Sequence, residues 1–245
     1  MARGFSFTPG EYYHIYNRGV DKRVIFKDQN DHDRFVVLLY LCNDEKPLNI
    51  REFWAPKVLN LNGAFKKDRG ERIVDIGAYC LMPNHFHLLA YERKKGGTST
   101  FMHKLQTAYS MYFNAKYERM GALFEGRFKA RIVNKEAYIE YLFAYIHLNP
   151  VKIIDPAWKE EGIADVLKAR DFLSSYRYSS YLDFSGTDRP EGRILEQSKE
   201  GPFGEYFKER KEFSDFLDNW LSSEDSAKDV AKEKAWKAIK PEDVK

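Results

Sequence analysis

Two histidines separated by one residue are the first feature of this chain that could do chemistry. They lie within Cys80–Leu89, directly after a Pro-Asn turn signal and at the start of an apolar run. If this run is a strand, His85 and His87 point to the same face, because side chains alternate along a strand. Two imidazoles about 7 Å apart along the backbone can bind one metal ion. Taken alone, however, such a pair is more typical of half-buried strand histidines.

A helix further along the chain provides a second group of candidates. The pattern over residues 134–149 is helical, and a proline follows it as a stop signal. Tyr145 and Asn149 are four residues apart and share one helical face, whereas His147 lies about 200° from Tyr145 around the helix. Tyr141 occupies roughly the same face one turn earlier. Tyrosines on a helix are usually packing residues, so a chemical role needs the two elements to act together.

In combination, these segments resemble the HUH (histidine–hydrophobic–histidine) superfamily, and within it the single-tyrosine transposases, specifically the REP-associated tyrosine transposases and their insertion-sequence relatives. The resemblance follows ordered blocks over most of residues 12–184. These blocks are Tyr13–Gly19, Ile25–Phe26, Met82–His87, Gly121–Ala130, Tyr145–Val151 and Tyr176–Tyr181. The resemblance implies an antiparallel palm, with the histidine pair on a central strand and the tyrosine helix packed nearby.

The resemblance also implies a metal-dependent mechanism with a covalent intermediate. His85, His87 and Asn149 would give two nitrogens and one amide oxygen to a divalent cation. Histidine ligands widen the choice beyond Mg²⁺ towards Mn²⁺. Tyr145, favoured over Tyr141 by its spacing from Asn149, would attack a phosphodiester of single-stranded DNA. The implied products are a 5′-phosphotyrosine and a free 3′-hydroxyl, formed at hairpins of palindromic repeats.

Two other functions fit the same fold. A metal-dependent nuclease would use water as its nucleophile and would form no covalent intermediate. A non-catalytic nucleic-acid-binding protein would not need a nucleophile. The complete set of His85, His87, Tyr145 and Asn149 favours the transposase.

Positive charge is concentrated in the middle of the chain. Ten basic and two acidic residues lie between Arg93 and Lys135, a net charge of +8, whereas the whole chain carries +3. This concentration predicts a phosphate-binding surface. Three of the basic residues alternate in what is expected to be a strand, so they should share one face. The predicted DNA contacts are Lys116, Arg119, Arg127, Lys129 and Arg131.

Composition narrows the class of protein further. No apolar run approaches the length of a bilayer, and residues 1–10 lack the apolar centre of a cleavable leader. Cys42 and Cys80 are too few for a disulfide framework or a zinc site. We therefore expect a cytoplasmic protein without a membrane segment, whose partner is single-stranded or hairpin DNA. The sequence leaves monomer and homodimer undecided.

The expected elements belong to the α+β class. Strands are expected at residues 12–18, 73–81, 85–92 and 124–133, and helices at 29–43, 99–119, 135–148 and about 204–222. This order predicts an antiparallel sheet palm of the ferredoxin or RRM-like type with helices on one face. Residues 1–155 are the predicted palm domain, with a surface insertion at about 44–72. Residues 156–245 are the predicted C-terminal extension, mostly helical.

Overall fold

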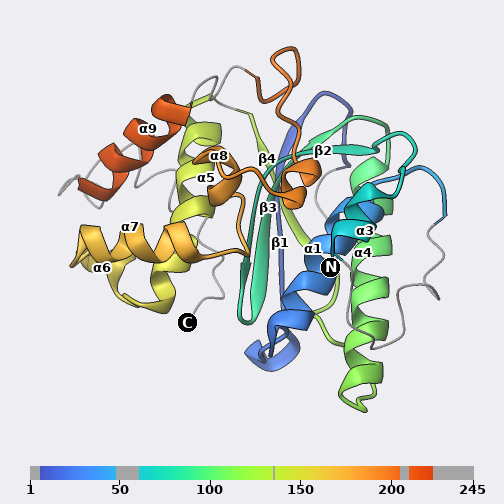
Figure 1. The fold of residues 1–245 in the computed structure, drawn as a ribbon. Helices are drawn as coiled ribbons and strands as arrows, with labels where there is room; N and C mark the ends of the chain where they lie inside the picture. Colours follow the sequence, from blue (N-terminus) through green and yellow to red (C-terminus); the bar gives the residue numbers. More distant parts are fainter. Residues whose placement is uncertain (1–5, 48–60, 135, 205–209, 223–245) are drawn as a thin grey trace.

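A four-stranded antiparallel sheet forms the centre of the computed structural model (Figure 1), which describes residues 6–47, 61–134, 136–204 and 210–222. The strands are β1 (Tyr12–Arg18), β2 (Val74–Met82), β3 (His85–Glu92) and β4 (Lys129–Val133). Their order is β2-β3-β1-β4, and every neighbouring pair is antiparallel. The histidine pair thus lies on a central strand, and the predicted α+β palm is confirmed.

Two helices cover one face of this sheet. α1 (Gln29–Leu41) begins with a capping box, in which the Asp28 side chain accepts from the Asp31 backbone and the Asp31 side chain accepts from the Asp28 backbone. α4 (Gly97–Lys116) follows β3. Fully buried apolar side chains, Phe86 among them, fill the space between these helices and the sheet. The predicted helical layer on one face is therefore present.

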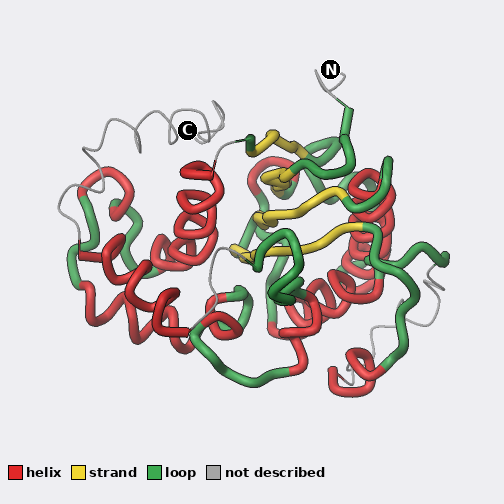
Figure 2. The backbone as a smooth tube through the Cα atoms, turned by 90° about the horizontal axis from the view of Figure 1, so that it is seen from above, coloured by secondary structure: helices red, strands yellow, loops and turns green. Residues whose placement is uncertain are grey.

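The opposite face, for which the sequence predicted no such layer, is covered as well. α5 (Glu136–Leu148) packs across β2 and β3, where Ala78, Cys80 and Leu89 form an apolar cluster with Ile146. β2 is buried along its whole length, and a strand that is apolar on both sides needs a layer on each. Figure 2 shows the strands from above, with helices on both sides.

Beyond α5 the chain extends this second layer. Its elements are η2 (Asn149–Ile153), α6 (Trp158–Glu161), α7 (Val166–Ser175), α8 (Tyr181–Phe184), η3 (Pro190–Ile194) and α9 (Arg210–Ser222). Residues 178–180 run beside β2. The Leu81 N–H donates to the Tyr178 carbonyl (2.9 Å), and the Ser180 N–H donates to the Tyr79 carbonyl (2.9 Å). This part of the chain therefore pairs with the outer edge of β2.

The expected and observed elements differ most before α5. The sequence predicted a strand from residue 124, but β4 begins at Lys129. Phe124 instead pairs with Gly19 in an isolated bridge. Gly126 then has φ of 65°, a left-handed conformation that turns the chain before the strand starts.

The predicted insertion contains one short helix, α3 (Leu61–Lys66), whose Phe65 is buried in the core. Residues 48–60 of the insertion lie outside the described part of the chain. The same holds for residues 205–209 of the predicted last helix and for residues 223–245. None of the described helices is long and apolar enough to cross a membrane.

Candidate active site

The two histidines of the motif begin β3. The two-residue turn Pro83–Asn84 joins β2 to β3 and pairs Met82 with His85. From there the strand alternates as predicted, so Phe86 enters the apolar core while His85 and His87 border a cavity on the other face. The turn matters because a shift of one residue in register would exchange the two faces.

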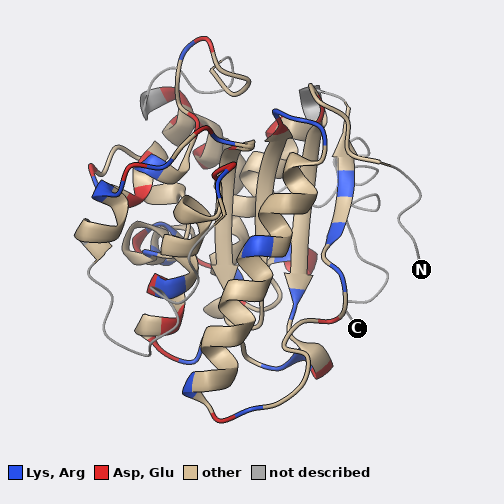
Figure 3. Ribbon diagram, turned by 90° about the vertical axis from the view of Figure 1, so that its right-hand side faces the viewer, with Lys and Arg blue, Asp and Glu red and all other residues tan. Residues whose placement is uncertain are grey.

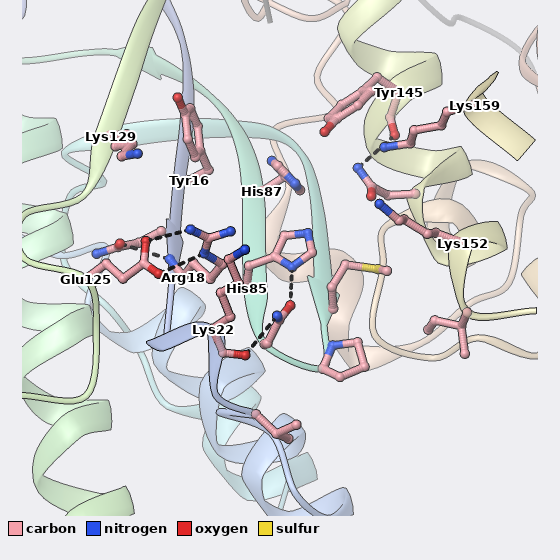
Figure 4. A pocket seen from close by; sticks show the side chains of 17 residues that line it. Tyr16, Arg18, Lys22, His85, His87, Glu125, Lys129, Tyr145, Lys152 and Lys159 are labelled. Atoms are coloured by element: carbon pink, nitrogen blue, oxygen red, sulfur yellow. Dashed lines mark hydrogen bonds and ion pairs between the residues drawn. The ribbon is translucent and has the colours of Figure 1, made fainter. Parts of the chain in front are cut away.

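This cavity has a volume of about 640 Å³. In Figure 4, the histidines lie in its middle, with Tyr145 and Lys159 on one side and Lys129 on the other. The charged side chains on its wall are Arg18, Lys22, Lys129, Lys152, Lys159 and Glu125. Five of these six are basic, and Glu125 is paired with Arg18 at 2.9 Å. Such a wall attracts phosphate groups.

The imidazoles in the cavity are neutral. Burial lowers the pKa of His85 to about 3, and burial together with the neighbouring rings of His85 and His14 holds the pKa of His87 well below its usual range. His85 Nδ1 lies 2.6 Å from Asn84 Oδ1, and the Asn84 amide donates to the Lys22 carbonyl (3.1 Å). Because an amide oxygen only accepts, His85 Nδ1 carries the proton. His85 Nε2 therefore keeps its lone pair.

His14, on β1, supports the second histidine. Its Nε2 lies 2.9 Å from His87 Nδ1, and both side chains are buried. On the other side of the ring, His87 Nε2 is buried and has no hydrogen-bond partner among the described residues. When His87 donates from Nδ1 to His14, its Nε2 has a lone pair available for a metal. The contact with His14 holds the His87 ring, and the tautomer in which His87 donates is the one that can act as a ligand.

Helix α5 brings Tyr145 to the same cavity. Its ring lies 5.2 Å from the His87 ring, centroid to centroid, in an edge-to-face arrangement. The side chain is 8% exposed, and this burial raises the pKa of the phenol, while the side chain of Asn149 and nearby cations oppose the rise. The tyrosine is thus protonated at neutral pH, and its deprotonation depends on what else enters the cavity.

Tyr141, the alternative nucleophile, has a different environment. Its ring stacks at 6.3 Å on that of Tyr145 and packs at 5.4 Å against Trp220 of α9. It is not among the described residues that line the cavity. Of the two tyrosines, the structure brings Tyr145 beside the histidines.

Asn149 follows the last residue of α5 at the edge of the cavity. Its Nδ2 donates to the Tyr145 carbonyl (3.3 Å), which leaves Oδ1 as the atom of the amide that could bind a cation. The described residues contain no cluster of three or more His, Cys, Asp or Glu that could hold a metal. A cation would therefore rely on His85, His87 and Asn149, with phosphate and water in the remaining positions. Two neutral imidazoles with free lone pairs and one amide oxygen fit a divalent ion such as Mn²⁺ or Mg²⁺.

The predicted DNA contacts on β4 lie close to this site. The register places Lys129 opposite Tyr16 and Arg131 opposite His14, so both basic residues are on the face of the histidines. Lys129 also lines the cavity. Arg127 is exposed and precedes the strand. The expected row of three basic residues on one strand is thus reduced to two.

The other two predicted DNA contacts lie near the end of α4. Lys116 forms ion pairs with Asp28 (2.6 Å) and Asp31 (2.7 Å), and these bonds raise its pKa although burial opposes the rise. Arg119 donates to Asn114 Oδ1 (2.7 Å). Neither is among the described residues lining the cavity. Figure 3 shows basic and acidic residues intermingled on the helices and loops, whereas the strands are mostly uncharged.

Several residues of the cavity were not predicted from the sequence. Arg18 and Glu125 each stand in a block of the family resemblance, so their pairing could have been expected from those blocks. Lys152 lies near the end of the predicted palm but was not singled out, and Lys159 belongs to the segment predicted only as an extension. No spacing in the sequence indicates that this segment turns back over Tyr145.

Comparison with known proteins places the chain in a family. The family model of IS200-like transposases matches residues 11–149, more than half of the chain. The chain therefore belongs to the IS200-like transposases, a family of DNA-cleaving and strand-transferring enzymes. The predicted membership among the HUH single-tyrosine transposases is confirmed. The matched range runs from β1 to the end of α5 and includes His85, His87, Tyr145 and Asn149.

One solved structure similar to this chain is described as a REP-associated tyrosine transposase bound to a REP hairpin. It is 12% identical, with a TM-score of 0.44, and the alignment covers 78% of this chain and 89% of that chain. A search among curated proteins found no significant match.

Proposed function

We propose that this protein is a transposase that nicks single-stranded DNA and transfers the strand through a covalent tyrosine intermediate. The observation that carries the proposal is the meeting of His85, His87 and Tyr145, from distant parts of the chain, on one cavity with a basic wall. Membership of the IS200-like transposases supports it. A second function is not favoured by any feature of the site.

In the proposed reaction, the phenol oxygen of Tyr145 attacks the phosphorus of a phosphodiester. The new bond to phosphorus forms as the bond from phosphorus to the 3′ oxygen breaks. The phenol proton passes to water, and the 3′ oxygen takes a proton from water. The products are a 5′-phosphotyrosine and a free 3′-hydroxyl. Because the covalent bond stores the phosphodiester linkage, the strand can be joined to another 3′ end without nucleotide hydrolysis.

His85, His87 and Asn149 are the residues we propose as ligands of a divalent cation, either Mg²⁺ or Mn²⁺. When bound, such a cation supplies Lewis-acid polarisation of the phosphodiester. The protein's own part is to keep the imidazoles neutral by burial and to hold the rings through Asn84 and His14. These contacts orient the ligand atoms before a metal arrives.

The proposed substrate is single-stranded DNA next to a hairpin of a palindromic repeat. The basic wall of the cavity supports a polyanionic strand, and Lys129 and Arg131 on β4 extend this surface beside the histidines. We propose residues 1–155 as the catalytic palm and residues 156–245 as its extension. One chain contains every residue named here.

The decisive experiment is capture of a covalent protein–DNA adduct. Single-stranded oligonucleotides carrying a palindromic hairpin are incubated with the full chain and Mn²⁺ or Mg²⁺, and the attached residue is mapped by mass spectrometry. We expect attachment at Tyr145. Tyr145→Phe removes only a hydroxyl, so it should fold and bind DNA but form no adduct.

Tyr141→Phe is the matched control and should keep adduct formation within a few-fold of the unaltered chain. If Tyr141→Phe loses the adduct and Tyr145→Phe keeps it, the nucleophile is one turn earlier. Cleavage without any adduct would indicate a nuclease that uses water. DNA binding without cleavage would indicate the non-catalytic alternative.

A further inference from the structure

Lys159 contacts the proposed nucleophile from outside the region that matches the family. It belongs to α6, beyond the matched residues 11–149. Its Nζ lies over the ring of Tyr145, 4.3 Å from the centroid. Figure 4 shows both side chains on the same side of the cavity. Its side chain is half-buried and lines the cavity.

The fold holds α6 in this position. Trp158, the first residue of α6, packs against the cluster formed by Ala144 and Leu148 of α5 and Val151 of η2. The helix is only one turn long, and it ends at Gly162, whose φ of 86° turns the chain away. Lys159 is therefore fixed relative to α5 by the packing of its neighbour in sequence.

The amine of Lys159 lies in a partly buried position on the basic wall of the cavity. Burial lowers the pKa of its amine to about 8, against a smaller opposing effect of Glu160. At neutral pH the ammonium form still predominates. A partly buried charge acts on nearby charges more strongly than a fully exposed lysine does, because less solvent screens it.

We infer that Lys159 is a catalytic cation, which offsets the negative charge that develops as the bond between Tyr145 and phosphorus forms and breaks. This inference rests on the proposed function and deepens it. It does not require Lys159 to gain or lose a proton. A fixed cation beside developing charge is a recurrent means of transition-state stabilisation.

The same charge serves both halves of the reaction. In cleavage, the tyrosine oxygen becomes negative as its proton passes to water, and this charge moves to the 3′ oxygen, which leaves and takes a proton from water. In joining, a new 3′-hydroxyl attacks the phosphotyrosine and gives its proton to water, and the tyrosine oxygen leaves with negative charge and then takes a proton from water. In each direction charge gathers at the Tyr145 oxygen, beside the ring that the Lys159 ammonium contacts.

The test compares Lys159→Met with Lys159→Arg in the full chain. Methionine keeps much of the length and apolar stem but removes the charge, whereas arginine keeps the charge. Lys168→Met is the matched control, because Lys168 is an exposed lysine of α7 in the same extension. For each variant, the single-turnover rate of adduct formation at saturating oligonucleotide and the Kd for that oligonucleotide are measured, together with the Tm.

We expect Lys159→Met to slow both adduct formation and strand joining by about 10²-fold, the effect typical of removing one transition-state donor. Its Kd should stay within about threefold, because many other phosphate contacts remain. Lys159→Arg should recover most of the rate. Lys168→Met should match the unaltered chain in rate, Kd and Tm.

Three results would overturn the inference. A normal rate in Lys159→Met would show that the charge is unnecessary. A raised Kd with a normal rate at saturation would make Lys159 a DNA-binding contact only. An equally slow Lys159→Arg would show that packing, not charge, is responsible. If the unaltered chain forms no adduct, the proposed function itself fails, which is a different outcome from any of these three.

Discussion

The two faces of β3 place neighbouring residues in opposite environments. On one face, Phe86 and Leu88 are fully buried against α1 and α4 within an apolar core. On the other, His85 and His87 border a cavity with basic walls, and His87 Nε2 is without a hydrogen-bond partner among the described residues. A buried polar atom without a partner costs about 1–3 kcal/mol of stability. The packed face therefore has to stabilise the strand on which the site is built.

Among the tests of this comparison, the largest expected effect is the loss of cleavage when either histidine is replaced. His85→Ala and His87→Ala should reduce cleavage below detection, because each removes a proposed ligand of the cation. DNA affinity should stay within a few-fold, since phosphate contacts dominate it. Gel-based cleavage and oligonucleotide binding, each with and without excess chelator, provide the measurements. Full cleavage by the unaltered chain in chelator would remove the metal from the mechanism.

The opposite pattern is expected from the packed face. Leu88→Ala should lower the free energy of unfolding by about 2–5 kcal/mol, since it leaves a cavity in a core that cannot fully close. At a temperature where the variant remains folded, its single-turnover cleavage rate should stay within a few-fold. Denaturant titration and cleavage assays test the two statements. If Leu88→Ala had normal stability but low activity, the two faces of β3 would not have these separate roles.

His14 gives a smaller effect, because it acts through His87. His14→Leu removes the hydrogen-bond partner of His87 Nδ1, and loss of such a supporting contact typically weakens metal binding about 10–100-fold. His14→Gln restores an acceptor oxygen and should recover part of the affinity. Mn²⁺ binding measured by calorimetry in the absence of DNA separates this effect from catalysis. Equal affinity in His14→Leu would mean that His87 needs no orienting partner.

The pH dependence of Lys159→Arg relative to the unaltered chain follows from the lowered pKa of about 8 at Lys159. Below that pH both side chains are cations, so the rate of Lys159→Arg divided by the rate of the unaltered chain should be constant. Above it, lysine loses its charge whereas arginine keeps it, so the ratio should rise, by about tenfold one unit above the pKa. Taking the ratio cancels the titration of Tyr145 and of the histidines. A flat ratio from pH 6 to 10 would contradict the expectation.

The smallest effect concerns the basic residues that surround the site. Lys129→Ala should weaken DNA binding a few-fold and flatten the salt dependence of affinity by about one unit, as expected for one lost phosphate contact. Lys116→Ala is the comparison, because Lys116 is paired with Asp28 and Asp31. The measurement is the DNA affinity of both variants at several salt concentrations. If Lys116→Ala flattens the slope as much as Lys129→Ala, the DNA also follows α4.

Local pattern was sufficient to predict β1, β2, β3 and the face that carries the histidines, but not the start of β4. Alternation along β3 placed His85 and His87 together, and the helical spacing predicted that Tyr145 of α5 and Asn149, which follows it, lie on the same side, where both line the cavity. The same spacing predicted that His147 does not share the face of Tyr145. In the structure its two ring nitrogens bond to the Phe143 carbonyl and to Ser180 Oγ, and it is not among the described residues that line the cavity. These features depend on neighbours a few residues apart, and the sequence records them directly.

Contacts between distant segments could not be predicted in the same way. The position of Lys159 over Tyr145 depends on how η2 and α6 turn after the helix, and the pairing of Lys116 with α1 depends on how two helices pack. The late start of β4 follows from one glycine, Gly126, in a left-handed conformation. The net charge of a segment does not show which lysines are ion-paired and which face the cavity. It therefore counted Lys116 and Lys129 alike.

The pairing of residues 178–180 with β2 also has a consequence for the order in which the molecule is assembled. The contact of Ser180 with Tyr79 joins positions 101 residues apart. Closing so long a loop is slower than forming the β2–β3 hairpin, which needs only a two-residue turn. During synthesis, the palm strands and Tyr145 leave the ribosome before α6 and this docking segment. We therefore expect a nascent chain to hold the histidines and the tyrosine in place while Lys159 of α6 is still missing from the cavity, so that full nicking activity appears only late in folding.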